Sequence, residues 1–196
     1  SVALMNISQD AAAALILEEQ LKHTPAEIGL LFNLHSAYAS LGNNIKAIET
    51  ALSAVALCPT DADAFNNLGA SFHAVNRNKD AALAFQTAID LNPSHATARL
   101  NLINTGNLDD ATLITETEYV IKKFKSQIQE RVLVGAIHNA AFSYFRVGKI
   151  KKGWEALEKG FSPLIDSNRG RRPQRNFSKP RWQGESLNGK TLMVWR

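Results

Sequence analysis

Cysteine is almost absent from the chain, since Cys58 is the single one among 196 residues. A lone cysteine excludes an internal disulfide, and no cluster of Cys and His has the spacing of a zinc site. We therefore expect no metal and no cofactor. Cys58 itself is expected to be a small buried apolar residue.

Long apolar runs are missing as well. The run at residues 11–17 is far shorter than the roughly 20 residues of a membrane helix, and Glu18 and Glu19 follow it directly. It also lacks the basic start and small-residue cleavage site of a signal peptide. We expect a cytoplasmic protein without membrane contact. Because Ser1 is not an initiator residue, we expect the chain to be a fragment of a longer one.

Acidic residues are scarce at the C-terminal end. Residues 1–165 carry 14 Lys and Arg against 16 Asp and Glu, whereas residues 166–196 carry 8 against 2. The net charge of +4 therefore belongs to that end. The basic run 167–177 could contact nucleic-acid phosphates. No series of stacking aromatics or recognition helix accompanies it, so a solvated linker is favoured and nucleic-acid binding is the weaker alternative.

What the chain does have is an internal period of 34 residues. Residues of the same type recur at this spacing: Pro25, Pro59 and Pro93, and likewise Ala13, Ala47 and Ala81. The segment from Leu31 to Pro59 also agrees in character with the segment from Phe65 to Pro93 at eight positions. Such agreement at a fixed period is typical of a repeat architecture.

The spacing inside each unit predicts a pair of helices. Leu31, Leu34 and Tyr38 follow one another at steps of three and four, which places them on one helical face. Gly42 then supplies the left-handed backbone with which a helix commonly ends. In the second helix, Ala47 is small enough to let the two helix backbones approach closely. A proline ends that helix and begins the next unit.

These units resemble the tetratricopeptide repeat (TPR), a helix–turn–helix of 34 residues. The segment from Phe65 through Pro93 matches closely, and the segment from Leu31 to Pro59 nearly as well. His35 departs from the family pattern, which prefers a small residue there. The resemblance implies an all-α, right-handed α-solenoid, an architecture that serves many partners. The expected organisation is a partial repeat in 1–25 with its second helix from Ser8 to His23, repeats in 28–61 and 62–95, a degenerate helix pair in 96–130, a repeat in 134–165, and a basic linker in 166–196 that leads into a truncated α/β domain.

In such a solenoid the first helices of the repeats line a concave groove. Asparagines recur on that face: Asn33, Asn67 and Asn101 at the period of 34, and Asn139 after 38 residues. They resemble the asparagine ladder in the superhelix of O-linked N-acetylglucosamine transferase, which holds the backbone of an extended peptide. A side-chain amide suits this role because it both donates and accepts hydrogen bonds and carries no charge. The alternative is an ordinary polar groove residue or a hydrogen bond between repeats.

Further residues are expected near the inner surface: Phe32, Asn66, His73, His138, Phe142, Phe145 and Arg146. Phe142 and Phe145 could anchor an apolar side chain of a peptide, or pack against the next helix. No histidine is paired with a nucleophile or a metal partner, so we predict no catalytic residue. His35 is expected between helices, and His23 and His95 at helix ends.

The stretch GESLNGKT, residues 184–191, fits the pattern of a phosphate-binding P-loop. A working P-loop follows a buried strand and opens a helix. Here a linker with Pro180 precedes it and the strand-like run from Thr191 to Trp195 follows, so nucleotide binding is not favoured. Residues 180–195 instead resemble the junction in bacterial proteins that fuse TPRs to a glycosyltransferase-like domain, whose first strand would be Thr191 to Trp195.

The sequence as a whole predicts a non-enzymatic scaffold that binds a protein or an extended peptide in its concave groove. The alternative is the N-terminal substrate-recognition arm of a bacterial glycosyltransferase-like enzyme whose catalytic domain lies outside this chain. Association of copies through the ends of the repeat array is a further expectation.

Overall fold

The computed structural model describes residues 2–124, 128 and 130–167, and every regular element in these ranges is a helix. The all-α prediction is confirmed. The helices are α1 (Val2–His23), α2 (Ile28–Ser40), α3 (Asn44–Leu57), α4 (Ala62–Ala74), α5 (Asn78–Leu91), α6 (Ala96–Asn104), α7 (Asp110–Phe124), α8 (Glu130–Arg146) and α9 (Ile150–Ser167). The basic linker, the P-loop-like stretch and the expected strand from Thr191 to Trp195 lie outside the described residues.

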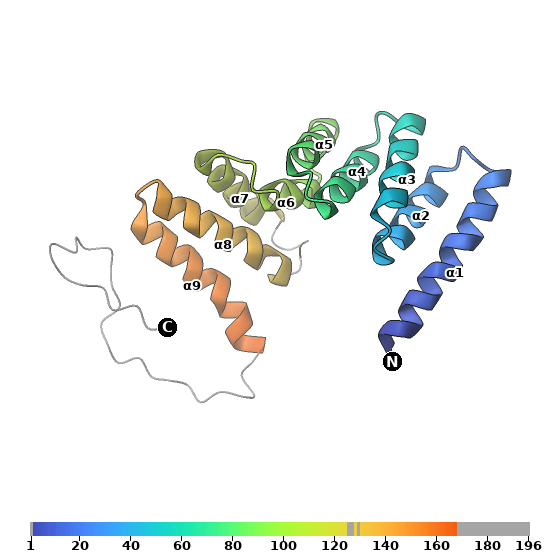
Figure 1. The fold of residues 1–196 in the computed structure, drawn as a ribbon. Coiled ribbons are helices and arrows are strands. Elements are labelled where there is room, and N and C mark those ends of the chain that lie inside the picture. Colours follow the sequence, from blue (N-terminus) through green and yellow to red (C-terminus); the bar gives the residue numbers. More distant parts are fainter. Residues whose placement is uncertain (1, 125–127, 129, 168–196) are drawn as a thin grey trace.

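The helices stack in order along an arc that runs from α1 to α9 (Figure 1). Each first helix packs against the second helix of its own pair, as α2 does with α3, α4 with α5 and α8 with α9. First helices also contact one another, in the order α2, α4, α6, α8. Among the described residues the second helices α1, α3, α5, α7 and α9 make no such contacts with one another. The first helices therefore lie on the inner, concave side of the array.

The turns between paired helices repeat one backbone arrangement. The amide of Asn43 donates to the carbonyl of Tyr38 at 2.9 Å, and the amide of Arg77 donates to Phe72 in the same way at 2.9 Å. Such a bond closes a helix when the residue before the donor is left-handed. Gly42 has φ 68°, as expected for glycine, while Asn76 adopts φ 60° at the equivalent position.

Paired helices approach closely where one residue is small. A Cβ added to Gly69 on α4 would lie 2.6 Å from ring atoms of Phe85 on α5, and Phe85 is 1% exposed. The repeat alanines Ala47 and Ala81 are likewise buried. The phenyl ring thus fills the space that the glycine leaves, which is how the helix pair reaches close packing.

Helix α1 differs from the sequence expectation in length, and α6 is short, as the sequence predicts. Helix α1 begins at Val2, not at Ser8, because the run ahead of Glu18 contains no glycine or proline that would end a helix. In the third unit α6 ends at Asn104, and Gly106 with φ 71° turns the chain early. No helix in the described part of the chain has the length and apolarity needed to cross a membrane.

Candidate functional site

The candidate site is the concave face of the first helices, and its geometry is clearest on α2. Residues at steps of three and four lie on one side of a helix. An open depression of about 460 Å³ between α1 and α2 is lined by Asp10, Ala13, Ile16, Leu17, Asn33, Ser36, Ala37 and Ser40. The equivalent line continues as Asn67 and Ala70 on α4, Asn101 and Asn104 on α6, and Asn139 and Phe142 on α8.

The depression is open because no helix in the described part of the chain covers the inner side of α1. Ile16 is 59% exposed, whereas Thr50 and Ala84, which stand at the same repeat position, are each 7% exposed. At those inner positions a first helix of the same pair covers the second helix. Asn33 is correspondingly exposed.

The four repeated asparagines differ in their surroundings. Asn33 and Asn139 are exposed, while Asn67 and Asn101 are half-buried. The side-chain amide of Asn101 donates to the side-chain oxygen of Asn66 at 3.0 Å, which links α6 to α4. Asn101, one of the four repeated asparagines, therefore makes a hydrogen bond between repeats, which was the alternative interpretation of these residues. Because an amide has two N–H groups and an acceptor oxygen, Asn101 retains capacity for a ligand.

At the α8 end of the face the surface becomes aromatic. Phe142 is 55% exposed, and its ring meets Phe145 edge to face with centroids 6.3 Å apart. Phe145 in turn meets Trp154 of α9 at 5.5 Å. A Cβ added to Gly153 would lie 2.3 Å from Phe145, so this ring fills the gap between α8 and α9 as Phe85 does in the second pair. Phe145 thus packs between helices, and Phe142 remains the accessible ring.

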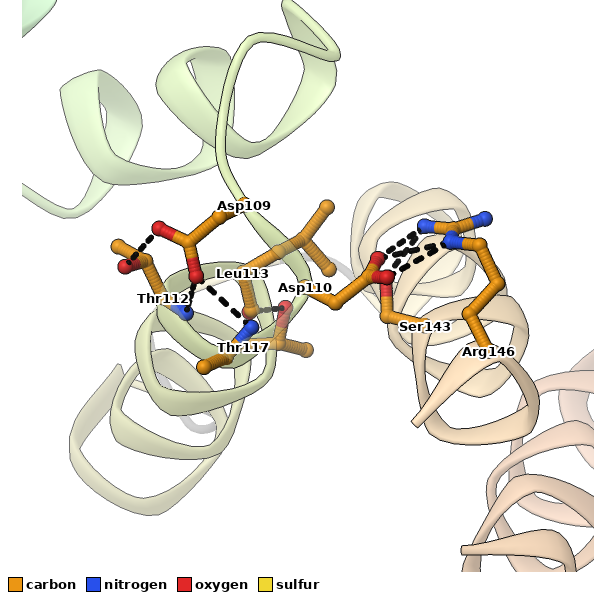
Figure 2. A network of polar contacts seen from close by, with 8 residues as sticks. Asp109, Asp110, Thr112, Leu113, Thr117, Ser143 and Arg146 are labelled. Atoms are coloured by element: carbon orange, nitrogen blue, oxygen red, sulfur yellow. Dashed lines mark hydrogen bonds and ion pairs between the residues drawn. The ribbon is translucent and has the colours of Figure 1, made fainter. Parts of the chain in front are cut away.

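Arg146 is held in a polar network rather than pointing free into the groove. Figure 2 shows its guanidinium against the carboxylate of Asp110 at the start of α7. The guanidinium Nε donates to the two Asp110 oxygens at 2.8 and 2.9 Å, and Nη2 donates to Ser143 at 2.8 Å. The hydrogen bond from Arg146 holds the pKa of Asp110 below its usual range.

The remaining predicted groove residues have mixed positions. Phe32 is half-buried and packs against the buried cluster of Leu31, Ala54 and Ala64. His73 is exposed, and its Nδ1 lies 2.9 Å from the side-chain oxygen of Asn78, within its own repeat. His138 is half-buried on α8.

The other histidines lie where the sequence places them. His35 is buried between α2 and α4, with Nε2 2.8 Å from the Ser71 hydroxyl. Ser71 donates its proton to the carbonyl of Asn67, so its oxygen accepts from His35. Burial lowers the pKa of His35. His95 caps α6 by accepting from the amide of Ala98 at 3.2 Å, and His23 ends α1.

Sequence reasoning missed Ser36 and Ser40 on this face, and Trp154 and Asp110 as the second-helix partners of Phe145 and Arg146. The two serines stand three and seven residues after Asn33, so the helical step alone could have found them. Trp154 and Asp110 depend on how neighbouring pairs pack. No group of three His, Cys, Asp or Glu side chains that could hold a metal is found in residues 2–124, 128 and 130–167.

No family model matches the chain. Among curated proteins, Protein FlbA of Caulobacter vibrioides is 27% identical over 169 residues, which cover 69% of this chain and 28% of FlbA. The chain therefore spans less than a third of the length of that relative.

The chain superposes on solved structures that include a TPR protein. The crystal structure of MamA superposes with a TM-score of 0.67 at 22% identity, over 83% of this chain and 92% of MamA. YrrB, described as a TPR protein with an unusual peptide-binding site, superposes with a TM-score of 0.62 at 20% identity, over 83% of this chain and 82% of YrrB. At such identities the likeness shows the fold, and the fold is that of a TPR solenoid.

Proposed function

We propose that this chain is a scaffold that binds an extended peptide along the concave face of its first helices. The observation that carries the proposal is the row Asn33, Asn67, Asn101 and Asn139, one amide on each of four first helices that follow one another in contact. Amide side chains at a regular spacing can hydrogen-bond a peptide backbone whatever its side chains are. The fold supports this function, because solenoids present such concave surfaces for binding.

The proposal is tested by panning a phage-displayed library of random peptides of about 12 residues, long enough to cross four helix pairs at 8–10 Å each. Enriched peptides are then synthesised with a fluorophore, and their affinity for the 196-residue chain and its variants is measured by anisotropy. Asn67→Ala should weaken binding about three- to tenfold, the value of one lost hydrogen bond. Alanine is the better helix former, so the thermal midpoint should not decrease.

Gln86→Ala is the matched control, because Gln86 is an exposed amide on the second helix α5. Its substitution should leave the affinity unchanged. If no peptide is enriched, or if Asn67→Ala and Gln86→Ala bind every enriched peptide as the parent chain does, the groove is not a peptide site.

A second candidate follows from the C-terminal residues. We propose as the alternative that the solenoid is the substrate-recognition arm of a larger glycosyltransferase-like protein, which the resemblance of residues 180–195 supports. The sequence of the full-length gene product tests it. A glycine-rich loop and a helix directly after Arg196 would support an α/β transferase, and a further helical repeat there would contradict it.

A further inference from the structure

Charge is divided unevenly between the two faces of the array. The first helix α2 carries no Asp, Glu, Lys or Arg, and α4 and α6 carry one each, Asp63 and Arg99. On α8 charged residues stand only at the two ends. The second helices α7 and α9 carry charges along their length. The concave side is therefore formed mainly by amides, hydroxyls and apolar side chains.

The described charges on the first helices are already engaged within the protein. Arg99 donates to Glu116 at 2.5 Å, and the two side chains are 11% and 24% exposed. Asp63 lies 3.0 Å from Nε2 of His95. The Arg146 guanidinium is held by Asp110. Over α4, α6 and α8 a ligand carboxylate or ammonium group would have to displace one of these partners to find a counter-charge. Asp10 of α1 lines the depression at the α2 end and is the exception.

The neutral face also changes character along its length. Three residues after each row asparagine stand Ser36, Ala70, Asn104 and Phe142, in order from α2 to α8. The first three are small or polar, and the last is an aromatic ring with 55% of its surface exposed. Among these four positions Phe142 presents the large apolar side chain, so an apolar ligand group would bury surface there. Ile16 of α1, which is 59% exposed, is a separate apolar contact in the depression at the α2 end.

We propose that the groove takes an uncharged internal segment of an extended polypeptide, with one apolar side chain of that segment packed on Phe142. This specificity rests on the peptide-binding function proposed above. Backbone amides of the ligand pair with the neutral asparagines, and a charged group placed over α4, α6 and α8 would lose hydration without gaining a counter-ion. Neighbouring helices lie 8–10 Å apart and an extended chain advances about 3.3–3.6 Å per residue, so one asparagine serves roughly three ligand residues.

The panning experiment tests this inference when the enriched peptides are sorted by charge. Enriched sequences should be depleted in Asp, Glu, Lys and Arg relative to the input library and should share an apolar residue near one end. Their dissociation constants should change less than about twofold between about 50 and about 500 mM NaCl, because salt screens charge pairs and leaves neutral contacts alone.

Phe142→Ala tests the aromatic end of the groove. Removing the ring should weaken a selected peptide about tenfold, and should weaken a peptide whose apolar residue is replaced by serine less than about twofold. Leu83→Ala is the matched control, since Leu83 is a large apolar residue on the second helix α5 and is 70% exposed. Its substitution should change neither affinity.

The outcomes separate the two proposals. Enriched peptides that are acidic or basic, with affinity that decreases more than about tenfold in high salt, would overturn the uncharged specificity and leave peptide binding intact. Equal effects of Phe142→Ala and Leu83→Ala would overturn the apolar contact. Failure to enrich any peptide would overturn the peptide-binding function, and with it this inference.

Discussion

At single positions the packing of each helix pair depends on which of two facing residues is small. In the second pair Gly69 is small and Phe85 is large, whereas in the first pair His35 stands at the position of Gly69 and Ala51 at that of Phe85. The large side chain thus lies on the second helix in the second pair and on the first helix in the first pair. His35 can occupy that buried position because Ser71 of the next repeat accepts its N–H. His35 departs from the family pattern, and the small Ala51 and the hydrogen-bonding Ser71 accommodate it.

Gly69→Ala should destabilise the chain. The added methyl group would lie 2.6 Å from the Phe85 ring, which is confined between α4 and α5. Overpacking of this kind costs about 1–3 kcal/mol in the free energy of unfolding, measured by urea denaturation. Gly135→Ala is the control, since its methyl group would meet only Asn104 at 4.0 Å. That change should stabilise α8 by about 0.5–1 kcal/mol, and an equal loss in both variants would contradict the packing argument.

The stability of the chain should decrease as the pH falls below about 6.5, the ordinary pKa of histidine. Burial lowers the pKa of His35 in the folded chain, so between its folded and unfolded pKa values the unfolded state binds the proton more readily. Urea denaturation at several pH values measures this. In His35→Asn the decrease should be shallower, and an unchanged pH slope would show that His35 does not titrate as described.

Among the helices, α7 is distinguished by how it begins. The carboxylate of Asp109 accepts from the amides of Ala111 and Thr112 at 3.0 Å each, and from the Thr112 hydroxyl at 2.6 Å (Figure 2). The hydrogen bond from the Thr112 hydroxyl contributes most, and the one from the Thr112 backbone amide next, to lowering the pKa of Asp109. The next residue, Asp110, joins the helix start to Arg146 on α8. The two adjacent carboxylates thus have different roles: Asp109 caps α7, and Asp110 forms an ion pair between α7 and α8.

Asp109→Ala should lower the free energy of unfolding, because the helix cap on the amides of Ala111 and Thr112 is lost. Asp110→Ala removes an ion pair with an exposed Arg146, so the expected loss is smaller. Both are measured by urea denaturation at neutral pH. A greater loss for Asp110→Ala than for Asp109→Ala would contradict the assigned duties.

Helix pairing could be predicted from the sequence because it depends on residue types at short, regular spacings along the chain. The period of 34 and the positions of Gly42 and Pro59 place α2 and α3 without any knowledge of contacts. The bond between Asn101 and Asn66 could not be predicted in the same way, because it joins unlike repeat positions on two helices. Nor could the engagement of Arg146, since the third unit breaks the period and shifts Asp110 out of register.

Over the whole molecule, similar polar contacts recur at two distant junctions of the array. Tyr38 on α2 donates to Glu18 on α1, and Tyr144 on α8 donates to Glu118 on α7. Burial, followed by the contact with Glu118, raises the pKa of Tyr144 to about 12. These contacts tie a first helix to the second helix before it. The first helices also contact one another, and the asparagine row lies on the concave side that they form.

The most direct test of that arrangement is nuclear magnetic resonance of the asparagine side-chain amides during titration with an uncharged peptide selected by panning. We expect the amide signals of the concave row, Asn33, Asn67, Asn101 and Asn139, to shift or broaden. Signals of exposed asparagines at helix ends, Asn43, Asn76 and Asn92, should stay in place. Changes confined to the helix-end asparagines, with the row unaffected, would contradict the claim that the peptide lies along the concave face.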